Sequence, residues 1–420
     1  MGNICSLTRD PADLLPYMTI LMPAIKNSLF DAIPEIRASA AKAMGSLSKG
    51  LGIEHSTEML GWLREHLNTN GISTNERLGA AQGFAELISV HGQPYYEVNI
   101  EEVIIKSTDE DAETRESYRS VIVFLPDSYA RFVDDLPRMV PIMIEGLSDE
   151  IDQVRKISMR SVKICIKQFG RLAPNQLVMP ILRMMFSTDS RVRQSSSILM
   201  YQLVKELEND IIKAQPKYVD MDTKYKILSS MFILKYDLIE KVHTQAGQIW
   251  KSLVDNQLIV LKQVIDTLIE IVFNIIQSSS YELQEMGLAC MRGLVEKFGE
   301  KLVGRALDIF EHLLDVATDS QQTIGICKVM FNMVSAATHR LLTAIAPRMI
   351  TILEDNLSDS SDEIREWSSK VFITMFQRQP DKNFIEPTLD KVILHKLKKY
   401  VRENKQEEAD RLIRSLKMMI

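Results

Sequence analysis

The chain has 420 residues, of which 45% are hydrophobic and 25% charged, and its net charge is −6. This composition is typical of folded proteins, and the acidic balance argues against a nucleic-acid-binding surface along the whole chain. The four cysteines are scattered and form no CxxC pair. That pattern argues against a disulfide framework or a zinc site and favours a reducing compartment. We therefore predict a cytoplasmic protein with no metal site and no cofactor.

The amino terminus, Met1–Ser6, matches the pattern for N-myristoylation and includes Cys5, a candidate for palmitoylation. The alternative is that Met1 begins a fragment, so that Gly2 is an interior residue; short motifs of this kind also arise by chance. Elsewhere no apolar run has the length needed to span a bilayer. The longest run, Leu258–Ile276, is interrupted by charged residues. With no secretory signal pattern either, we predict no contact with a membrane.

A pattern with a period of about 40 residues repeats along the chain, which is typical of HEAT and armadillo arrays. Its anchor is most often an arginine. The anchor arginines are Arg37, Arg77, Arg115, Arg155, Arg193 and Arg365, and other units have His243, Gln284 and Gln321 at this position. We expect the anchor arginines to be structural and to bond to acidic groups and carbonyls of the adjacent repeat, as a ladder.

Other residue types recur at fixed offsets from the anchor. Six residues before it are polar residues expected to cap the second helix of each unit: Asp31, Asp109, Asp149, Ser187, Asp237, Ser278 and Asp359. Three residues after it are small residues that allow close helix packing: Ala40, Ala80, Ser158, Ser196, Ala246, Gly287 and Ser368. Fifteen residues after it are glycines expected to end the helix in a left-handed conformation: Gly52, Gly92, Gly170 and Gly299.

Each unit therefore reads as a helix, a short turn and a second helix, and no segment shows the period-two pattern of a strand. The predicted fold is an all-α solenoid of the HEAT/armadillo type with about ten helix pairs. Units one to five occupy 1–208, a loop occupies 209–224, and units six to ten occupy 225–420, as one continuous array. Because both ends lack the polar caps of a complete solenoid, we expect a piece of a longer array, or ends that pair with something.

Catalytic signatures are missing from the sequence. It contains no phosphate-binding glycine loop, no HExxH motif and no GxSxG motif. The seven histidines lie far apart, so no two are placed to share a metal ion on one helical turn. We predict that the chain is not an enzyme.

Arg191 is the first candidate for binding a partner. It lies two residues before the anchor Arg193, where most other units have an acidic or neutral residue. The repeat does not require an arginine there, and arginine is enriched at the centres of protein interfaces. A solvated turn residue explains Arg191 equally well, so both interpretations stay open at this point.

A basic stretch near the carboxyl end is the second candidate. Its main residues are Lys396, Lys398, Lys399 and Arg402, with Lys391 and Lys405 on either side. Such a cluster can contact an anionic partner such as RNA phosphates. A solvated helical face is the favoured alternative, since clustered charges on a helix are most often exposed to water.

Several runs resemble one known family in order. In the first two units these are Asn3–Thr8, Asp13–Tyr17, Pro34–Arg37 and Glu76–Glu86, and later come Leu294–Lys301 and Asp362–Glu366. The chain resembles the carboxy-terminal part of the general control non-derepressible one family. These are large ribosome-associated HEAT proteins that activate the kinase of translation initiation factor two alpha.

The resemblance implies a non-catalytic scaffold that binds the RWD domain of this kinase and promotes its activation on ribosomes during amino-acid starvation. It implies the ribosome as a further partner, through other parts of a longer chain. The family has a tryptophan-arginine-any-arginine run near its docking arginine, and here Ser190 replaces the tryptophan while Arg191 and Arg193 match. The resemblance therefore implies that Arg191 and Arg193 bind the partner, with Arg191 favoured because Arg193 already has a structural role. The family also has an interior run like Gly2–Leu7, which implies that the lipidation motif is accidental. The alternatives are a generic HEAT adaptor of the transport or phosphatase-scaffold type, and a module that contacts the ribosome or RNA.

Overall fold

The computed structural model describes residues 13, 15–208, 213, 215–298, 300–378 and 382–419. Within these ranges it contains twenty α-helices, α2 to α21, and no strand. The helices form ten consecutive pairs, so the all-α prediction with about ten helix pairs is confirmed. The chain divides into two compact units, of which the first comprises Met1–Ile211 with Lys217–Val219 and the second Ile212–Pro216 with Asp220–Ile420. The Met1–Ser6 motif lies outside the described residues.

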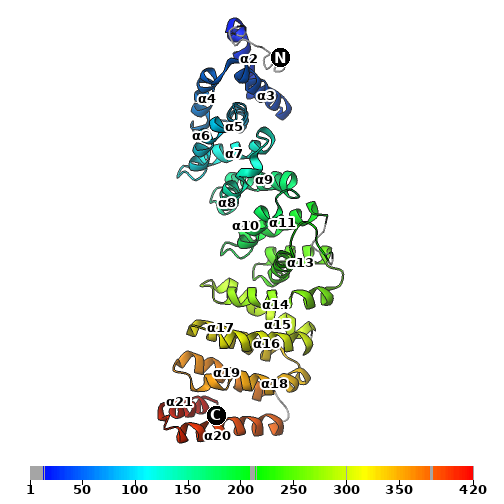
Figure 1. Cartoon of the computed structure of the whole chain (residues 1–420), viewed down its shortest axis with the longest axis vertical. Coiled ribbons are helices and arrows are strands. Elements are labelled where there is room, and N and C mark those ends of the chain that lie inside the picture. Colours follow the sequence, from blue (N-terminus) through cyan, green and yellow to red (C-terminus); the bar gives the residue numbers. More distant parts are fainter. Residues whose placement is uncertain are drawn as a thin grey trace. The chain divides into compact units, whose positions relative to one another are not determined.

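Unit 1 contains five helix pairs (Figure 1). Their bounds are α2 Met18–Leu29, α3 Pro34–Leu51, α4 Ile53–Leu67, α5 Thr74–Ser89, α6 Gln93–Lys106, α7 Ala112–Ser128, α8 Leu136–Glu145, α9 Asp152–Phe169, α10 Pro174–Met184 and α11 Ser190–Glu206. The second helices α3, α5, α7, α9 and α11 contact one another in succession and form one layer. Each first helix covers the second helix of its own pair.

Unit 2 contains the other five pairs. Their bounds are α12 Met221–Ile233, α13 Glu240–Leu253, α14 Gln257–Ile276, α15 Tyr281–Phe298, α16 Glu300–Asp315, α17 Ser320–Ala336, α18 His339–Leu353, α19 Asp362–Arg378, α20 Lys382–Arg402 and α21 Gln406–Met419. First helices α12 to α20 contact one another in succession, and so do second helices α15 to α21. The loop predicted over 209–224 is wrong at its end, because Asp220 accepts a hydrogen bond from the Thr223 N–H and starts α12 at Met221.

The small residues three positions after the anchor are all buried, in each helix pair that has a small residue there. Ala80 and Ala246 are fully buried, and Ser158 and Ser196 are 1% exposed. Because these positions are buried where helices pack together, a small side chain there allows the helices to approach closely. The predicted packing role of these residues is confirmed.

The anchor arginines donate hydrogen bonds to the turn that precedes their own helix. In five helix pairs, Nη1 of the anchor arginine donates to the carbonyls of the residues six and five positions earlier, at 2.6–3.1 Å. These arginines are Arg37, Arg115, Arg155, Arg193 and Arg365. Gln284 donates to the Ser278 carbonyl at 2.6 Å in the same way. Each such bond satisfies carbonyls that the turn leaves unpaired.

The side chain six residues before the anchor has a different role from the predicted helix cap. Asp31, Asp109, Asp149 and Asp237 each accept the backbone N–H two residues later, at 2.8–3.0 Å. The helix begins three residues before the anchor, so the capping position is one residue earlier than that, as at Asp111. These aspartates therefore shape the turn that leads into the helix. The capping prediction was wrong because the start of the helix was placed two residues too early.

Two anchor arginines also link one helix pair to the next within unit 1. Arg77 contacts Glu113 and Glu116 of the next second helix at 3.0 and 2.8 Å. Arg115 donates from Nε to Asp149 at 2.8 Å and from Nη2 to the other oxygen of that carboxylate at 3.1 Å. The predicted ladder between repeats is confirmed at these two positions.

The glycines after the second helices behave in two ways. Gly52 and Gly92 have φ of +87° and +81°, where glycine is strongly favoured. Gly170 keeps a helical φ of −53°, so the left-handed prediction is wrong there, because α9 runs on into a turn. Gly299 lies outside the described residues.

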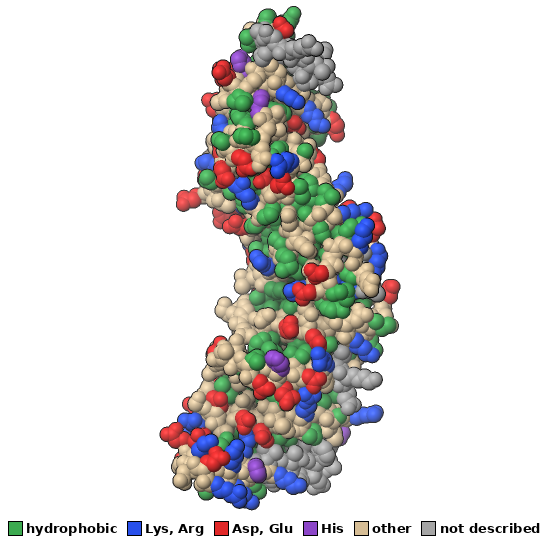
Figure 2. Space-filling view, in the orientation of Figure 1, with side chains coloured by type: hydrophobic (Ala, Val, Ile, Leu, Met, Phe, Trp, Pro, Cys, Tyr) green, Lys and Arg blue, Asp and Glu red, His purple; other side chains and the backbone are tan. Residues whose placement is uncertain are grey.

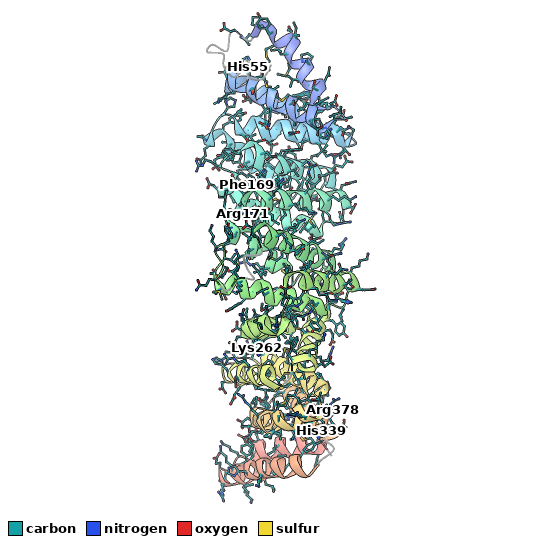
Figure 3. The ribbon with its side chains drawn as sticks, turned by 90° about the vertical axis from the view of Figure 1, so that its right-hand side faces the viewer. His55, Phe169, Arg171, Lys262, His339 and Arg378 are labelled. Carbon is teal, nitrogen blue, oxygen red and sulfur yellow. The ribbon has the colours of Figure 1, made fainter. Side chains whose placement is uncertain are left out.

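Arginines close the ends of neighbouring second helices. Arg171 donates from Nε to the Glu206 carbonyl at 2.9 Å, and Arg378 donates from Nη2 to the Ala337 carbonyl at 2.9 Å. Both arginines are labelled in Figure 3. Cations at helix carboxyl ends satisfy the last carbonyls and complement the helix dipole.

In the part of the chain that the structure covers, every helix is too short or too polar to cross a membrane.

Candidate protein-docking site

The turn before α11 carries the first predicted site residue. Asp189 is the capping residue of α11, and its Oδ1 accepts the Arg191 backbone N–H at 2.8 Å. The same carboxylate accepts from the Arg191 side chain, at 3.2 Å from Nε and 2.8 Å from Nη2. Arg191 is thus held over the first turn of α11 by its own cap.

The Arg191 guanidinium remains open to solvent. Its side chain is 55% exposed, against 26% for Asp189. Nη1 has no protein partner among the described residues. Because a guanidinium carries five N–H donors, pairing with Asp189 leaves donors available to a carboxylate outside the chain.

The pair with Arg191 alters the Asp189 carboxylate. The hydrogen bond from the Arg191 side chain lowers the pKa of Asp189, and the bond from the Arg191 backbone lowers that pKa further against the opposing effect of burial. Asp189 is therefore charged at neutral pH, and its pairing with Arg191 restricts that side chain before any partner arrives. Ordering a long side chain in advance reduces the entropy lost on binding.

Arg193 occupies a different environment from Arg191. It is fully buried, and Nη1 donates to the carbonyls of Ser187 and Thr188 at 2.9 and 3.1 Å. A side chain without exposed surface cannot touch a partner, so Arg193 shapes the turn that presents Arg191. The prediction that Arg193 binds a partner was therefore wrong, and only Arg191 stays a predicted contact.

The basic stretch on α20 also contains both a buried and several exposed cations. Lys396 is 8% exposed and pairs with Asp355 and, at 3.9 Å, with Glu354. The prediction that Lys396 belongs to a patch for an anionic partner was therefore wrong, because its ammonium pairs with the end of the preceding helix pair. Lys398, Lys399 and Arg402 are exposed. These three stay a predicted patch for an anionic partner.

The face of the described residues that Figure 2 shows has no broad basic patch. On the side shown in Figure 2, acidic and basic side chains are interspersed over both units. This arrangement matches the many ion pairs between exposed residues, such as Arg305 with Asp266 and Arg348 with Glu311. Exposed cations that are already paired are poor sites for phosphate.

A buried cluster of polar groups in unit 1 was missed from the sequence. Ser48 Oγ and Ser56 Oγ lie 2.9 and 2.5 Å from His91 Nε2, and the two hydroxyls also contact each other. Both serines are fully buried, so no substrate can reach them and the cluster is structural. His91 lies 43 and 35 residues after the two serines, and this spacing matches no motif. Only the packing of α3 on α4 and the turn after α5 brings them together.

This cluster predicts that unit 1 loses stability in acid. Burial, and secondarily Lys49, lowers the pKa of His91 below 6.5. A depressed pKa contributes stability that is present above pH 6.5 and lost as the pH falls through the folded-state pKa. We expect wild type to lose more unfolding free energy than His91→Gln between pH 7 and pH 5, in urea titrations at both values. Equal losses in the two proteins would show that His91 is not the group that titrates.

Cysteine and metal chemistry receive no support from the described residues. Burial raises the pKa of Cys165 to about 12 and that of Cys327 to about 11, so both thiols are protonated and unreactive at neutral pH. No group of three His, Cys, Asp or Glu side chains that could hold a metal ion occurs in the described ranges.

Comparison with known proteins finds similar proteins over most of the chain. A family described as elongation factor 3/GNC1 HEAT repeat matches residues 1–58. The eIF-2-alpha kinase activator GCN1 of Dictyostelium discoideum is 28% identical over 397 residues, 89% of this chain and 15% of the relative. The protein of the same name from Saccharomyces cerevisiae is 26% identical over 414 residues, 94% of this chain and 15% of the relative. The human stalled ribosome sensor GCN1 is 26% identical and covers 89% of this chain.

The chain spans about 15% of the length of these curated relatives. Among solved structures, importin beta covers 94% of this chain and 52% of its own, with 12% identity and a TM-score of 0.34. That likeness is too low to support an argument, so the HEAT fold rests on the helix pairs and the family match. The resemblance seen in the sequence is confirmed: over 89–94% of its length, this chain is similar to the GCN1 proteins.

Proposed function

We propose that this chain is a docking scaffold that binds the RWD domain of the initiation factor two alpha kinase through the turn before α11. The observation that carries the proposal is the exposed, pre-ordered Arg191 at a position where the repeat needs no arginine. Relatives named as activators of this kinase and as stalled ribosome sensors support the class of partner.

The proposed contact is a charge-assisted hydrogen bond from the Arg191 guanidinium to a carboxylate of the RWD domain. Such bonds are about twice as strong as neutral ones. The buried Arg193 donates to a carbonyl of the turn, and the Asp189 carboxylate accepts a hydrogen bond from the Arg191 side chain. The scaffold itself performs no chemistry. Its contribution is to hold the kinase domain near the ribosome and thereby raise its effective concentration there.

Titration calorimetry of the chain against the isolated RWD domain tests this proposal. We expect Arg191→Ala to weaken binding at least tenfold, or about 1.4 kcal/mol, without a change in the unfolding free energy. Arg183→Ala on α10 is the matched control, since Arg183 is also exposed in unit 1 and forms no ion pair with the described residues. Its affinity should stay at the wild-type value.

Two other outcomes have definite meanings. Binding that Arg191→Ala leaves unchanged would keep the scaffold function and move the contact to another surface. No binding by a folded, helical chain would contradict the proposal and favour a generic HEAT adaptor.

A further inference from the structure

Four cations form a stripe along one face of α9. They are Lys156, Arg160, Lys163 and Lys167, called the α9 stripe below, and all four are exposed. Because they follow one another at spacings of four, three and four residues, they lie within one narrow arc of the helix. The stripe extends over about 16 Å, since an α-helix rises about 1.5 Å per residue. It places a ridge of positive charge on a chain whose net charge is −6.

Most of the α9 stripe has no counter-ion. Lys156 pairs with Asp152 of the same helix at 2.6 Å. The side chains of Arg160, Lys163 and Lys167 have neither an ion pair nor a hydrogen bond with the described residues. Several other exposed arginines of unit 1 are paired, namely Arg131 with Asp134, Arg138 with Glu101 and Arg171 with Glu208. Like charges three and four residues apart on a helix repel each other, so the stripe gives the folded chain no stability of its own.

The repeat does not require cations at these positions. Counted from the anchor of each helix pair, the same four positions hold no cation in α5 or α7, one in α11 and two in α3. In α7 they are Glu116, Ser120, Val123 and Asp127. The run of four cations is therefore a feature of α9 and not of the helical array.

Partly exposed apolar side chains lie on both sides of the α9 stripe. Ile157 and Ile164 lie on one side of it, and Met159 lies on the other. A surface on which cations lie beside aliphatic side chains is complementary to a partner with both acidic and apolar residues.

We propose that the α9 stripe is a docking surface for an acidic amphipathic helix of a partner protein. Carboxylates at the same three- and four-residue spacings on that helix pair with the cations of the stripe in charge-assisted hydrogen bonds. Apolar residues next to these carboxylates pack on Ile157, Ile164 or Met159. An amphipathic helix laid along a helical surface is a recurring mode of protein recognition. This surface is separate from Arg191, and the inference does not rest on the proposed binding of the RWD domain.

The surroundings of the stripe favour carboxylates over the phosphates of RNA. Sites for single-stranded nucleic acid combine cations with aromatic rings on which the bases stack. Two partly exposed rings of the neighbouring second helices, Phe124 on α7 and Tyr201 on α11, already have a cation against them. The Arg160 guanidinium carbon lies 5.9 Å from the centroid of Phe124, and Lys205 Nζ lies 5.4 Å from that of Tyr201. The side chains that flank the stripe on α9 itself are aliphatic, which suits an amphipathic helix.

Fluorescence anisotropy with a labelled synthetic helix and the whole chain tests the proposal. The probe is an alanine-based peptide of about 18 residues with Glu at the spacings of the stripe and Leu beside each Glu. Replacing every Glu with Gln should weaken binding about tenfold or more, and replacing every Leu with Ser should weaken it several-fold. Equal affinities of the Glu and Gln peptides would overturn the proposal. Undiminished binding of the Ser peptide, or equally tight binding of an RNA of the same charge, would overturn the choice of an amphipathic helix.

Charge reversal shows whether the probe binds at the α9 stripe. Lys163→Glu combined with Lys167→Glu should weaken binding of the Glu peptide about tenfold or more. The matched control combines Lys42→Glu with Lys49→Glu, which changes the net charge equally at two exposed positions of α3 in the same unit. This control should leave the affinity nearly unchanged, and an equal loss in both variants would overturn the proposal. Circular dichroism checks that both variants are folded. Neither experiment uses the RWD domain, so a failure here is distinct from a failure at Arg191.

Discussion

Replacing Gly79 with alanine is expected to lower the free energy of unfolding of unit 1 by about 3 kcal/mol or more. Gly79 lies in α5, where a Cβ atom would stand 1.9 Å from the Leu29 carbonyl oxygen and 2.9 Å from its carbon. These are backbone atoms at the end of α2, so no side-chain rotation relieves the overlap. The helices must move apart, which disturbs the buried packing around Ala80 and Ala81.

Gly61→Ala on α4 is the control for this substitution. Gly61 is also inside a helix of unit 1, but a Cβ atom there meets nothing within 4 Å. Since alanine has the higher helix propensity, Gly61→Ala should stabilise the chain by about 1 kcal/mol. Urea unfolding of both variants gives the comparison. Equal effects would show that the close approach of α2 and α5 is not what requires glycine at Gly79.

Arg193→Ala is expected to be the most damaging substitution at the turn before α11, at about 3 kcal/mol of unfolding free energy or more. The side chain is fully buried and donates to the carbonyls of Ser187 and Thr188. Alanine leaves both carbonyls without this donor and opens a cavity of most of an arginine side chain. Binding of the RWD domain should fall with it, because the turn that presents Arg191 loses its support.

Two variants separate the reasons for this loss. Arg193→Met fills much of the volume but donates no hydrogen bond, so it should recover only the packing part of the stability. Arg191→Ala, two residues away and largely exposed, should change the unfolding free energy by less than about 0.5 kcal/mol. Thermal or urea unfolding measures all three. If Arg193→Ala proved as mild as Arg191→Ala, the proposed support of the turn would be wrong.

The sequence by itself determined the repeat and the helical class. The period of about 40 residues, the anchor arginines and the small residues after them are local signals, since each depends on spacing within one helix or turn. The small residues at Ala80 and Ser196 were correctly predicted to be buried. Helix starts were less well defined, because an aspartate such as Asp109 serves equally well in a turn or at a cap.

The tertiary structure alone decided what each long side chain contacts. Arg191 and Arg193 lie at one turn, yet one is exposed and the other buried. Lys396 and Lys399 share a helix, yet only Lys399 faces solvent. The direction of such a side chain depends on the neighbouring helix, whose distance is set by residues such as Gly79 in other parts of the chain.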